Sequence, residues 1–193
     1  MDAFKYIGTY TDAFGGEQII ADESWTSGSF LFHVSQYNND ESWLIAQNDS
    51  ELRSQYCSDW NYYTQEDCEA AGSTWFDLAD KWSRFDIADS DGSLYYCQSA
   101  YDAETEDDAL AASADASDIG AGCNGFGWSE IREKFKYTGT YEDTFGGSHT
   151  ISAFKWNSGS LLFHVSQYSN EESWLIAQND SENRSQYCSD WTL

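Results

Sequence analysis

The chain has 193 residues, a formal net charge of −25 and 40% hydrophobic residues, which include nine Trp, thirteen Tyr and eleven Phe. So many aromatic side chains exclude a disordered acidic polypeptide and predict a folded, highly soluble protein of one or two modest domains. The negative charge argues against nucleic acid and anionic membranes as partners, and no apolar run approaches the roughly 20 residues of a membrane span.

The chain contains one long stretch twice. Residues 4–60 return as residues 135–191, with roughly 42 aligned positions identical, far more than chance periodicity gives. We therefore divide the chain into segment A (residues 1–61), segment B (62–134) and segment A′ (135–193). Segments A and B are expected to form one domain, in which B is a diverged A. Segment A′ is then an incomplete second domain.

Segment A predicts four strands, at residues 5–11, 18–25, 30–37 and 43–47, separated by turns rich in Gly, Asn and Asp. This spacing is typical of an antiparallel β-sandwich or barrel, built here from repeated half-domains of about 60 residues with one or two short helices. Residues 17–24 change almost entirely in A′, which indicates an exposed face or a sheet edge. The later strands barely change, which indicates burial or a shared contact, although recent duplication would leave the same trace.

Segment B opens with a predicted short helix, since Thr64 and Asp67 fit a capping box and Gly72 suits the position after the helix. A second short helix is predicted near residues 109–112, after a similar Thr and Asp pair. Residues 92–101 follow the pattern of residues 28–37, which fits either a diverged copy of A or a generic Gly-Ser hairpin exit.

The five Cys indicate an oxidising compartment, and we expect a mature extracellular chain although its first residues are not a signal peptide. Cys57 and Cys68 lie close in sequence and predict a local disulfide, while Cys97 and Cys123 predict a second one in B. Cys188 is the odd residue, either free or bonded to another subunit. No Cys or His grouping has the spacing of a zinc site.

The three His residues do not predict an enzyme. His33 and His164 are the same strand position in the two copies, and His149 replaces Gln18, so that position does not require a base. No nucleophile motif accompanies them. Asp89 and Asp91 precede Gly92 and fit either the start of a calcium loop or a plain hairpin turn.

Three Asn residues match the N-glycosylation pattern, Asn48, Asn179 and Asn183. Exposed Trp side chains are candidates for stacking on glycan rings or for an interface, although core packing is the alternative role for most of them. The candidates are Trp25, Trp43, Trp60, Trp156, Trp174 and Trp191.

Three stretches together resemble an uncharacterised all-β domain of secreted bacterial proteins. They are Tyr-x-Gly-Thr-Tyr-x-Asp-x-Phe-Gly-Gly at 6–16, Tyr-Tyr-Cys-Gln-Ser-Ala-Tyr-Asp at 95–102 and Gly-Cys-x-Gly-Phe-Gly-Trp at 122–128. The resemblance implies a family unit made of A plus B, in most members without the insert at 57–75. It implies fold and compartment only, and no activity.

Two functions from different classes follow from these patterns. Half a β-domain leaves unpaired backbone edges and an uncovered apolar face, and pairing with another copy of the chain would satisfy both. The first expectation is therefore a structural subunit of an extracellular fibre or surface layer, which polymerises by exchange of strands or half-domains. The alternative is a secreted β-sandwich module that binds carbohydrate or Ca²⁺.

Overall fold

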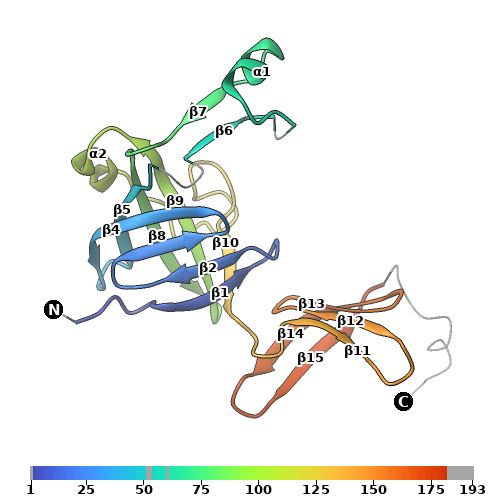
Figure 1. Ribbon diagram of the computed structural model, residues 1–193. Coiled ribbons are helices and arrows are strands. Elements are labelled where there is room, and N and C mark those ends of the chain that lie inside the picture. The colour runs from blue at the N-terminus through green and yellow to red at the C-terminus, as the bar shows by residue number, and fades with distance from the viewer. Residues whose placement is uncertain (1, 51–53, 60, 182–193) are drawn as a thin grey trace. The chain divides into compact units, whose positions relative to one another are not determined.

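The computed structural model describes residues 2–50, 54–59 and 61–181, and its fold is all-β with two short helices (Figure 1). The chain divides into two compact units, the first made of residues 1–12 and 16–131 and the second of residues 13–15 and 132–193. The first 61 residues form β1 (Gly8–Asp12), β2 (Glu17–Ile20), β3 (Ser24–Ser27), β4 (Phe30–Asn38), β5 (Trp43–Asn48) and β6 (Gln55–Cys57). Segment B forms α1 (Gln65–Ala70), β7 (Trp75–Asp77), β8 (Trp82–Ser90), β9 (Ser93–Ala103), α2 (Glu106–Ala111) and β10 (Ser129–Glu133).

The first unit is a closed antiparallel barrel rather than a sandwich. Its strand order is β1-β10-β9-β8-β5-β4-β3-β2, so segment A supplies five neighbouring strands and segment B supplies three. The predicted single strand at 18–25 is wrong, because the chain reverses between β2 and β3, where the Ala21 amide donates to the Ser24 carbonyl at 2.8 Å. This turn contains no Gly, Asn or Pro, and its signal is limited to Asp22 and Ser24, which is weaker than in the other turns of the segment.

The barrel interior is filled by aromatic and aliphatic side chains from both segments. Trp25 is fully buried and stacks on Phe85 of segment B, with ring centroids 4.3 Å apart, and Phe32 meets the same ring edge-on at 4.9 Å. An eight-stranded barrel has an interior just wide enough to be filled by side chains. The A and B strands therefore share one core, and neither could bury these rings alone.

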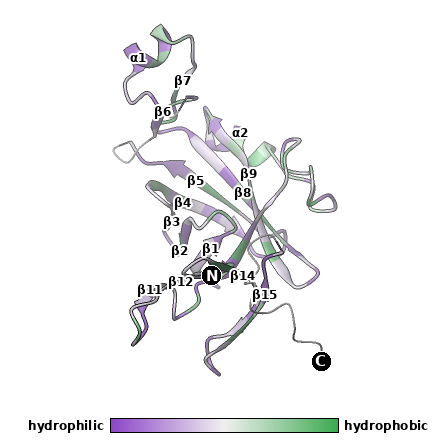
Figure 2. Ribbon diagram, turned by 90° about the vertical axis from the view of Figure 1, so that its right-hand side faces the viewer, coloured by the Kyte–Doolittle hydropathy of each residue, from purple (hydrophilic) through white to green (hydrophobic). Residues whose placement is uncertain are grey.

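Helix α2 covers part of the outside of the barrel (Figure 2). Thr105 caps this helix by accepting from the Asp108 amide, as the sequence predicts. Ala109 of the helix is fully buried against Trp43 and Ile45 of β5. The outer face of β5 is thus as well covered as its inner face.

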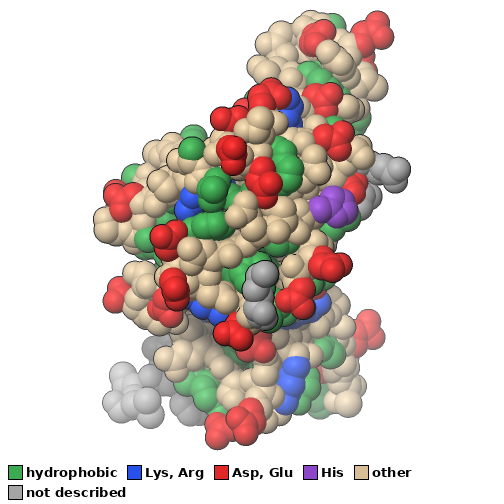
Figure 3. Space-filling view, turned by 90° about the vertical axis from the view of Figure 1, so that its left-hand side faces the viewer, with side chains coloured by type: hydrophobic (Ala, Val, Ile, Leu, Met, Phe, Trp, Pro, Cys, Tyr) green, Lys and Arg blue, Asp and Glu red, His purple; other side chains and the backbone are tan. Residues whose placement is uncertain are grey.

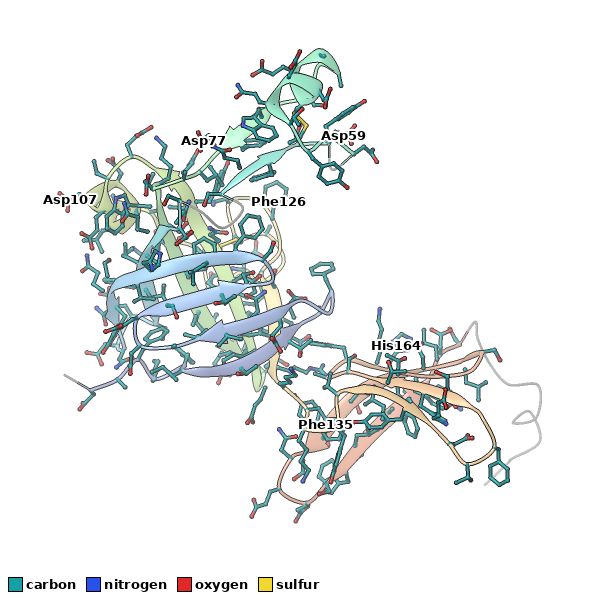
Figure 4. All side chains as sticks on the ribbon, in the orientation of Figure 1. Asp59, Asp77, Asp107, Phe126, Phe135 and His164 are labelled. Atoms are coloured by element: carbon teal, nitrogen blue, oxygen red, sulfur yellow. A yellow bond between two sulfur atoms is a disulfide. The ribbon has the colours of Figure 1, made fainter. Side chains whose placement is uncertain are left out.

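An insert between β5 and β8 stands beyond one end of the barrel and consists of β6, α1 and β7 (Figure 1). Helix α1 begins after the predicted cap Thr64, which accepts from the Asp67 amide at 3.2 Å. The Cys57–Cys68 disulfide joins β6 to α1, and Figure 4 shows its sulfur–sulfur bond beside the helix. The second disulfide, Cys97–Cys123, ties β9 to the loop before β10. Both disulfides form between the Cys residues that the sequence pairs.

The second unit is one five-stranded antiparallel sheet, and Figure 4 labels Phe135 and His164 in it. Its strands lie in chain order, and Phe135, Ala153 and Val165 form the most buried part of the unit. The strands are β11 (Gly139–Glu142), β12 (Ser148–Ile151), β13 (Lys155–Ser158), β14 (Leu161–Ser169) and β15 (Trp174–Asn179).

Candidate functional site

The two copies fold into sheets with the same internal register. Gly8 pairs with Ile20 in the barrel, and Gly139 pairs with Ile151 in the second sheet, 131 positions later in each case. The register shift in β4 after Val34 recurs in β14 after Val165. The duplicated sequence therefore specifies the same five-stranded pattern whether or not segment B completes it.

The edges of the two sheets differ. In the barrel, β5 pairs with β8 and β1 lies beside β10, so both outer strands of segment A are hydrogen-bonded to segment B. In the second unit, β11 and β15 are the end strands, and no strand among residues 2–50, 54–59 and 61–181 pairs with their outer sides. Such edges present a row of backbone donors and acceptors that can pair with another chain.

The outer face of β15 exposes two large apolar side chains. Trp174 is 39% exposed and Ile176 is 53% exposed, whereas their counterparts Trp43 and Ile45 are 8% and 0% exposed. The indole N–H donates to a Glu two residues earlier in both copies, so the local geometry of the Trp is the same. In the barrel, Trp43 and Ile45 are covered by β8 and α2 of segment B.

Polar groups that contact segment B are also retained in A′. Ser35 Oγ and Gln36 Nε2 donate to Glu106 Oε1 of α2, at 2.6 and 2.8 Å. The corresponding residues of β14 are Ser166 and Gln167, and both are exposed. Ser166 and Gln167 therefore occupy the strand positions that, in the barrel, donate hydrogen bonds to Glu106 of α2.

A buried ion pair on β8 of segment B lies against Trp43 of segment A, and sequence reasoning missed it. Arg84 Nη2 lies 2.8 Å from Asp86 Oδ1, both side chains are 10% exposed, and the guanidinium lies over the Trp43 ring at 5.1 Å. Ser99 Oγ donates to Asp86, and Arg84 Nη1 donates to the Leu110 carbonyl of α2. The signal available was a basic residue two positions before an acidic one, on the same face of a strand, in a chain with only nine Lys and Arg.

Arg132 holds the second unit together, and no motif indicates it in advance. Its Nη1 donates to the carbonyls of Val165 at 2.8 Å and Ala153 at 3.3 Å, and its guanidinium lies 4.4 Å from the centre of the Phe154 ring. Phe154 stands where segment A has Glu23, so A′ gains an aromatic partner for this cation.

The other sequence-predicted residues lie apart from one another. Asn48 is 4% exposed and its Nδ2 donates to the carbonyls of Leu78 and Tyr101, so the folded barrel does not present it for glycosylation, whereas Asn179 is exposed. Trp25 and Trp43 are buried in the barrel and do not form a surface platform. Four predicted residues fall outside the described residues, namely Trp60, Asn183, Cys188 and Trp191.

The titratable candidates occupy structural positions. His33 Nε2 contacts Asp49 Oδ2 at 2.7 Å, and His164 makes the same contact with Asp180. Asp89 and Asp91 lie at the β8–β9 hairpin, where Asp91 and Gly92 have φ values of 53° and 77°, as a two-residue turn requires. Among the described residues there is no group of three or more His, Cys, Asp or Glu side chains that could hold a metal ion.

The surface is dominated by acidic groups, and Asp and Glu are spread over the face seen in Figure 3, with few Lys or Arg among them. Within the described part of the chain, no helix has the length and apolar character needed to cross a membrane. Comparisons of the chain with protein-family models, with curated proteins and with solved structures give no match. The resemblance to a secreted bacterial β-domain therefore stays a prediction, and the functional evidence is the geometry of the chain itself.

Proposed function

We propose that this protein is a structural subunit of an extracellular self-assembling fibre or surface layer, in which another copy of the chain completes the sheet of segment A′. The two disulfides support an oxidising environment, since such bonds persist outside the cytosol. The A′ sheet supports self-association, because none of the described residues pairs with the outer sides of its end strands, and Trp174 and Ile176 are exposed.

The observation that carries the proposal is the retention of B-contacting side chains in A′. The changed residues gather in β2 and β3, which pair with each other and with β1 and β4. Two segment A residues that lie against B do change: Gln18, whose Nε2 donates to the Tyr96 hydroxyl at 3.5 Å, becomes His149, and Phe30, which lines a cavity together with Gln98, becomes Leu161. The retained pairs are Trp25/Trp156, Phe32/Phe163, Ser35/Ser166, Gln36/Gln167, Trp43/Trp174, Ile45/Ile176 and Asn48/Asn179.

The barrel supplies the register of the proposed contact. Trp43 pairs with Asp86 and Ile45 pairs with Arg84 in the β5–β8 ladder. Because β15 is the counterpart of β5 in the repeat, the same register applies when β15 of one copy pairs with β8 of another. Trp174 then pairs with Asp86, and Ile176 pairs with Arg84. Helix α2 of the donor copy then covers the exposed outer face of β15 and places Glu106 beside Ser166 and Gln167.

The number of segments determines the form of the assembly. These 193 residues hold two A-type sheets and one B segment, so each copy can close one barrel. When copies exchange B segments, the number of closed barrels stays the same, and only the identity of the open sheet changes. A copy that gives its B segment to a neighbour leaves its own segment A open. The contact joins two different surfaces and is therefore heterologous, which builds a filament unless the rotation closes a ring. Open sheets gathered along the filament at high effective concentration then bury their apolar faces against one another.

The test is the size and shape of the pure, oxidised protein at increasing concentration. Light scattering after size-exclusion chromatography should show mass growing with concentration, and electron microscopy should show filaments or sheets. Ile176→Lys places a charge on the exposed edge strand and should suppress growth, whereas Thr150→Lys, an exposed change on β12, should not. A strict monomer at tens of micromolar would refute the proposal, and a closed dimer that grows no further would indicate isologous pairing of two A′ sheets instead.

A further inference from the structure

A cavity of about 340 Å³ opens at the end of the barrel that carries the insert. It lies where the β3–β4 turn and the ends of β5 and β9 meet the first residues of the insert. Its size is within the range of small-molecule sites, which often occupy the mouths of β-barrels. The side chains that define its character are Phe30, Phe32, Tyr56, Leu78, Gln98 and Tyr101.

The aromatic walls of the cavity are held in place by the insert. Tyr56 of β6 stacks on Phe76 of β7 with ring centroids 4.9 Å apart, and it meets Phe30 edge-on at 6.5 Å. The next residue, Cys57, is bonded to Cys68 of α1, so the strand that carries Tyr56 is fixed at its end. Burial, followed by the charges of Tyr101 and Asp102, raises the pKa of Tyr56, which therefore stays neutral.

The polar groups of the cavity are few, and the protein already satisfies most of them. Asn48 donates both Nδ2 hydrogens to backbone carbonyls and accepts from Ser83 Oγ at 2.6 Å. Ser54 Oγ donates to the Asp49 carbonyl. Gln98 Nε2 donates to Ser83 Oγ at 2.9 Å, and within the part of the chain that the structure describes its Oε1 accepts no hydrogen bond. The cavity therefore offers flat apolar walls, the amide carbonyl of Gln98 and the phenol hydroxyls of Tyr56 and Tyr101.

These features select among ligand classes. A sugar needs partners for several hydroxyl groups, more than one amide carbonyl and two phenol hydroxyls can supply. An anion is disfavoured because none of the described residues that line the cavity is Lys or Arg, and because the chain has a net charge of −25. We propose that the cavity binds a small, neutral, planar ring compound that carries one hydrogen-bond donor, with the ring between the aromatic walls and the donor on Gln98 Oε1.

The comparison of the two copies supports this assignment independently. Residues 31–37 of the barrel are identical to residues 162–168 of the second sheet, yet the residue just before them changes from Phe30 to Leu161. The aromatic residue is present in the copy that has the insert and the cavity. In the other copy, the same position faces neither β6 nor β9, since segment A′ pairs with neither strand.

Titration calorimetry of the full, oxidised chain with indole tests the proposal. Indole should bind saturably with one site per chain. N-methylindole lacks the N–H donor and should bind about five-fold more weakly, as expected for one lost hydrogen bond. Phe30→Leu, which installs the residue that A′ carries, should also weaken indole binding about five-fold through loss of the aromatic wall. The matched exchange Leu161→Phe should leave binding unchanged.

Four results would overturn the assignment. They are the absence of saturable indole binding up to its solubility, equal affinity for indole and N-methylindole, equal weakening by Phe30→Leu and Leu161→Phe, and binding of methyl β-glucoside in place of indole. Melting curves of both variants confirm that the barrel remains folded, so that a loss of binding reports on the cavity.

Discussion

Ile45 and Ile176 occupy the same strand position in two sheets of the same register, yet the first is fully buried and the second is 53% exposed. The side chains and their immediate neighbours in sequence are identical, so the surroundings alone produce the difference. β8 lies beside Ile45 and Ala109 of α2 packs over it, and both come from segment B. The difference in exposure between the two Ile side chains thus shows how much surface segment B covers on an A-type sheet.

The two isoleucines should respond very differently to truncation. Ile45→Ala removes buried methyl groups from a closed interface and should lower the free energy of unfolding of the barrel by about 2–5 kcal/mol. Ile176→Ala removes atoms that water already reaches and should change stability by no more than about 0.5 kcal/mol in the dilute monomer. Urea unfolding with the disulfides intact measures both. Equal losses would mean that the second sheet is covered in solution.

The Arg84–Asp86 pair should tolerate removal of both partners better than removal of one. Arg84→Met leaves the Asp86 carboxylate buried without its cation and should cost about 3–5 kcal/mol, whereas the double change to Met and Leu should recover much of this loss. Lys81→Met breaks an exposed pair with Glu104 and should cost less than about 1 kcal/mol. A double-mutant cycle by urea unfolding gives the coupling, and an additive cycle would contradict this account.

The sequence predicts local structure well because the local signals are strong. The caps Thr64 and Thr105, the Gly turns and the Cys57–Cys68 disulfide follow from residues close in the chain, and the Cys97–Cys123 pairing follows from the two Cys that remain in segment B. The choice between barrel and sandwich does not, because it depends on β1 lying beside β10 after the whole of A and B has intervened. No short pattern encodes such a contact.

The candidate surface was predictable in kind but not in detail. The duplication alone indicates that A′ lacks whatever B supplies to A. It does not indicate that α2 covers Trp43 and Ile45, or that Glu106 receives Ser35 and Gln36, because these contacts join residues about 60 or more positions apart. The cavity was equally hidden, since its walls come from the insert and from β9.

The two disulfides should stabilise different parts of the molecule. Cys97 and Cys123 are 26 residues apart and join a barrel strand to a loop, so changing both to Ser should lower barrel stability by about 3–4 kcal/mol. Cys57 and Cys68 are 11 residues apart within the insert, so their removal should loosen β6 and α1 and leave the barrel transition in place. Hydrogen exchange by residue distinguishes local from global opening, and a barrel that melts equally in both variants would contradict the assignment.

Tyr168 should make the second unit sensitive to alkali. Burial raises the pKa of Tyr168 to about 12, an effect that the nearby Arg132 opposes, and its hydroxyl donates to the Glu133 carbonyl. Since the folded pKa lies above the ordinary value of 10.0, its contribution to stability is fully present below pH 10 and is lost as pH rises toward 12. Absorbance titration of phenolate should show a late step that Tyr168→Phe removes. An unchanged late step in the variant would assign it to another Tyr.

A hydrogen-bond relay survives the change from Gln18 to His149. In the barrel, Gln18 Nε2 donates to Asp12 Oδ2 at 3.1 Å, and its Oε1 accepts from the Trp25 indole at 2.9 Å. In the second sheet, His149 Nε2 lies 3.1 Å from Asp143, and its Nδ1 accepts a longer bond, 3.4 Å, from the Trp156 indole. A neutral imidazole with its proton on Nε2 supplies the same donor and acceptor as the amide.

The relay predicts which substitutions the barrel accepts at position 18. Gln18→Leu leaves the Trp25 N–H without a buried acceptor and removes one of the donors to Asp12, which keeps the bond from the Gly16 amide, so it should cost about 1–3 kcal/mol. Gln18→His restores both partners, as A′ does with His149, and should cost less than the Leu variant near neutral pH. In acid, the protonated ring has two donors and no acceptor, so the advantage of His over Leu should shrink. Urea unfolding of the two variants at neutral and acid pH measures this difference, and a His variant that is no more stable than the Leu variant at neutral pH would show that packing, and not the relay, is the requirement at this position.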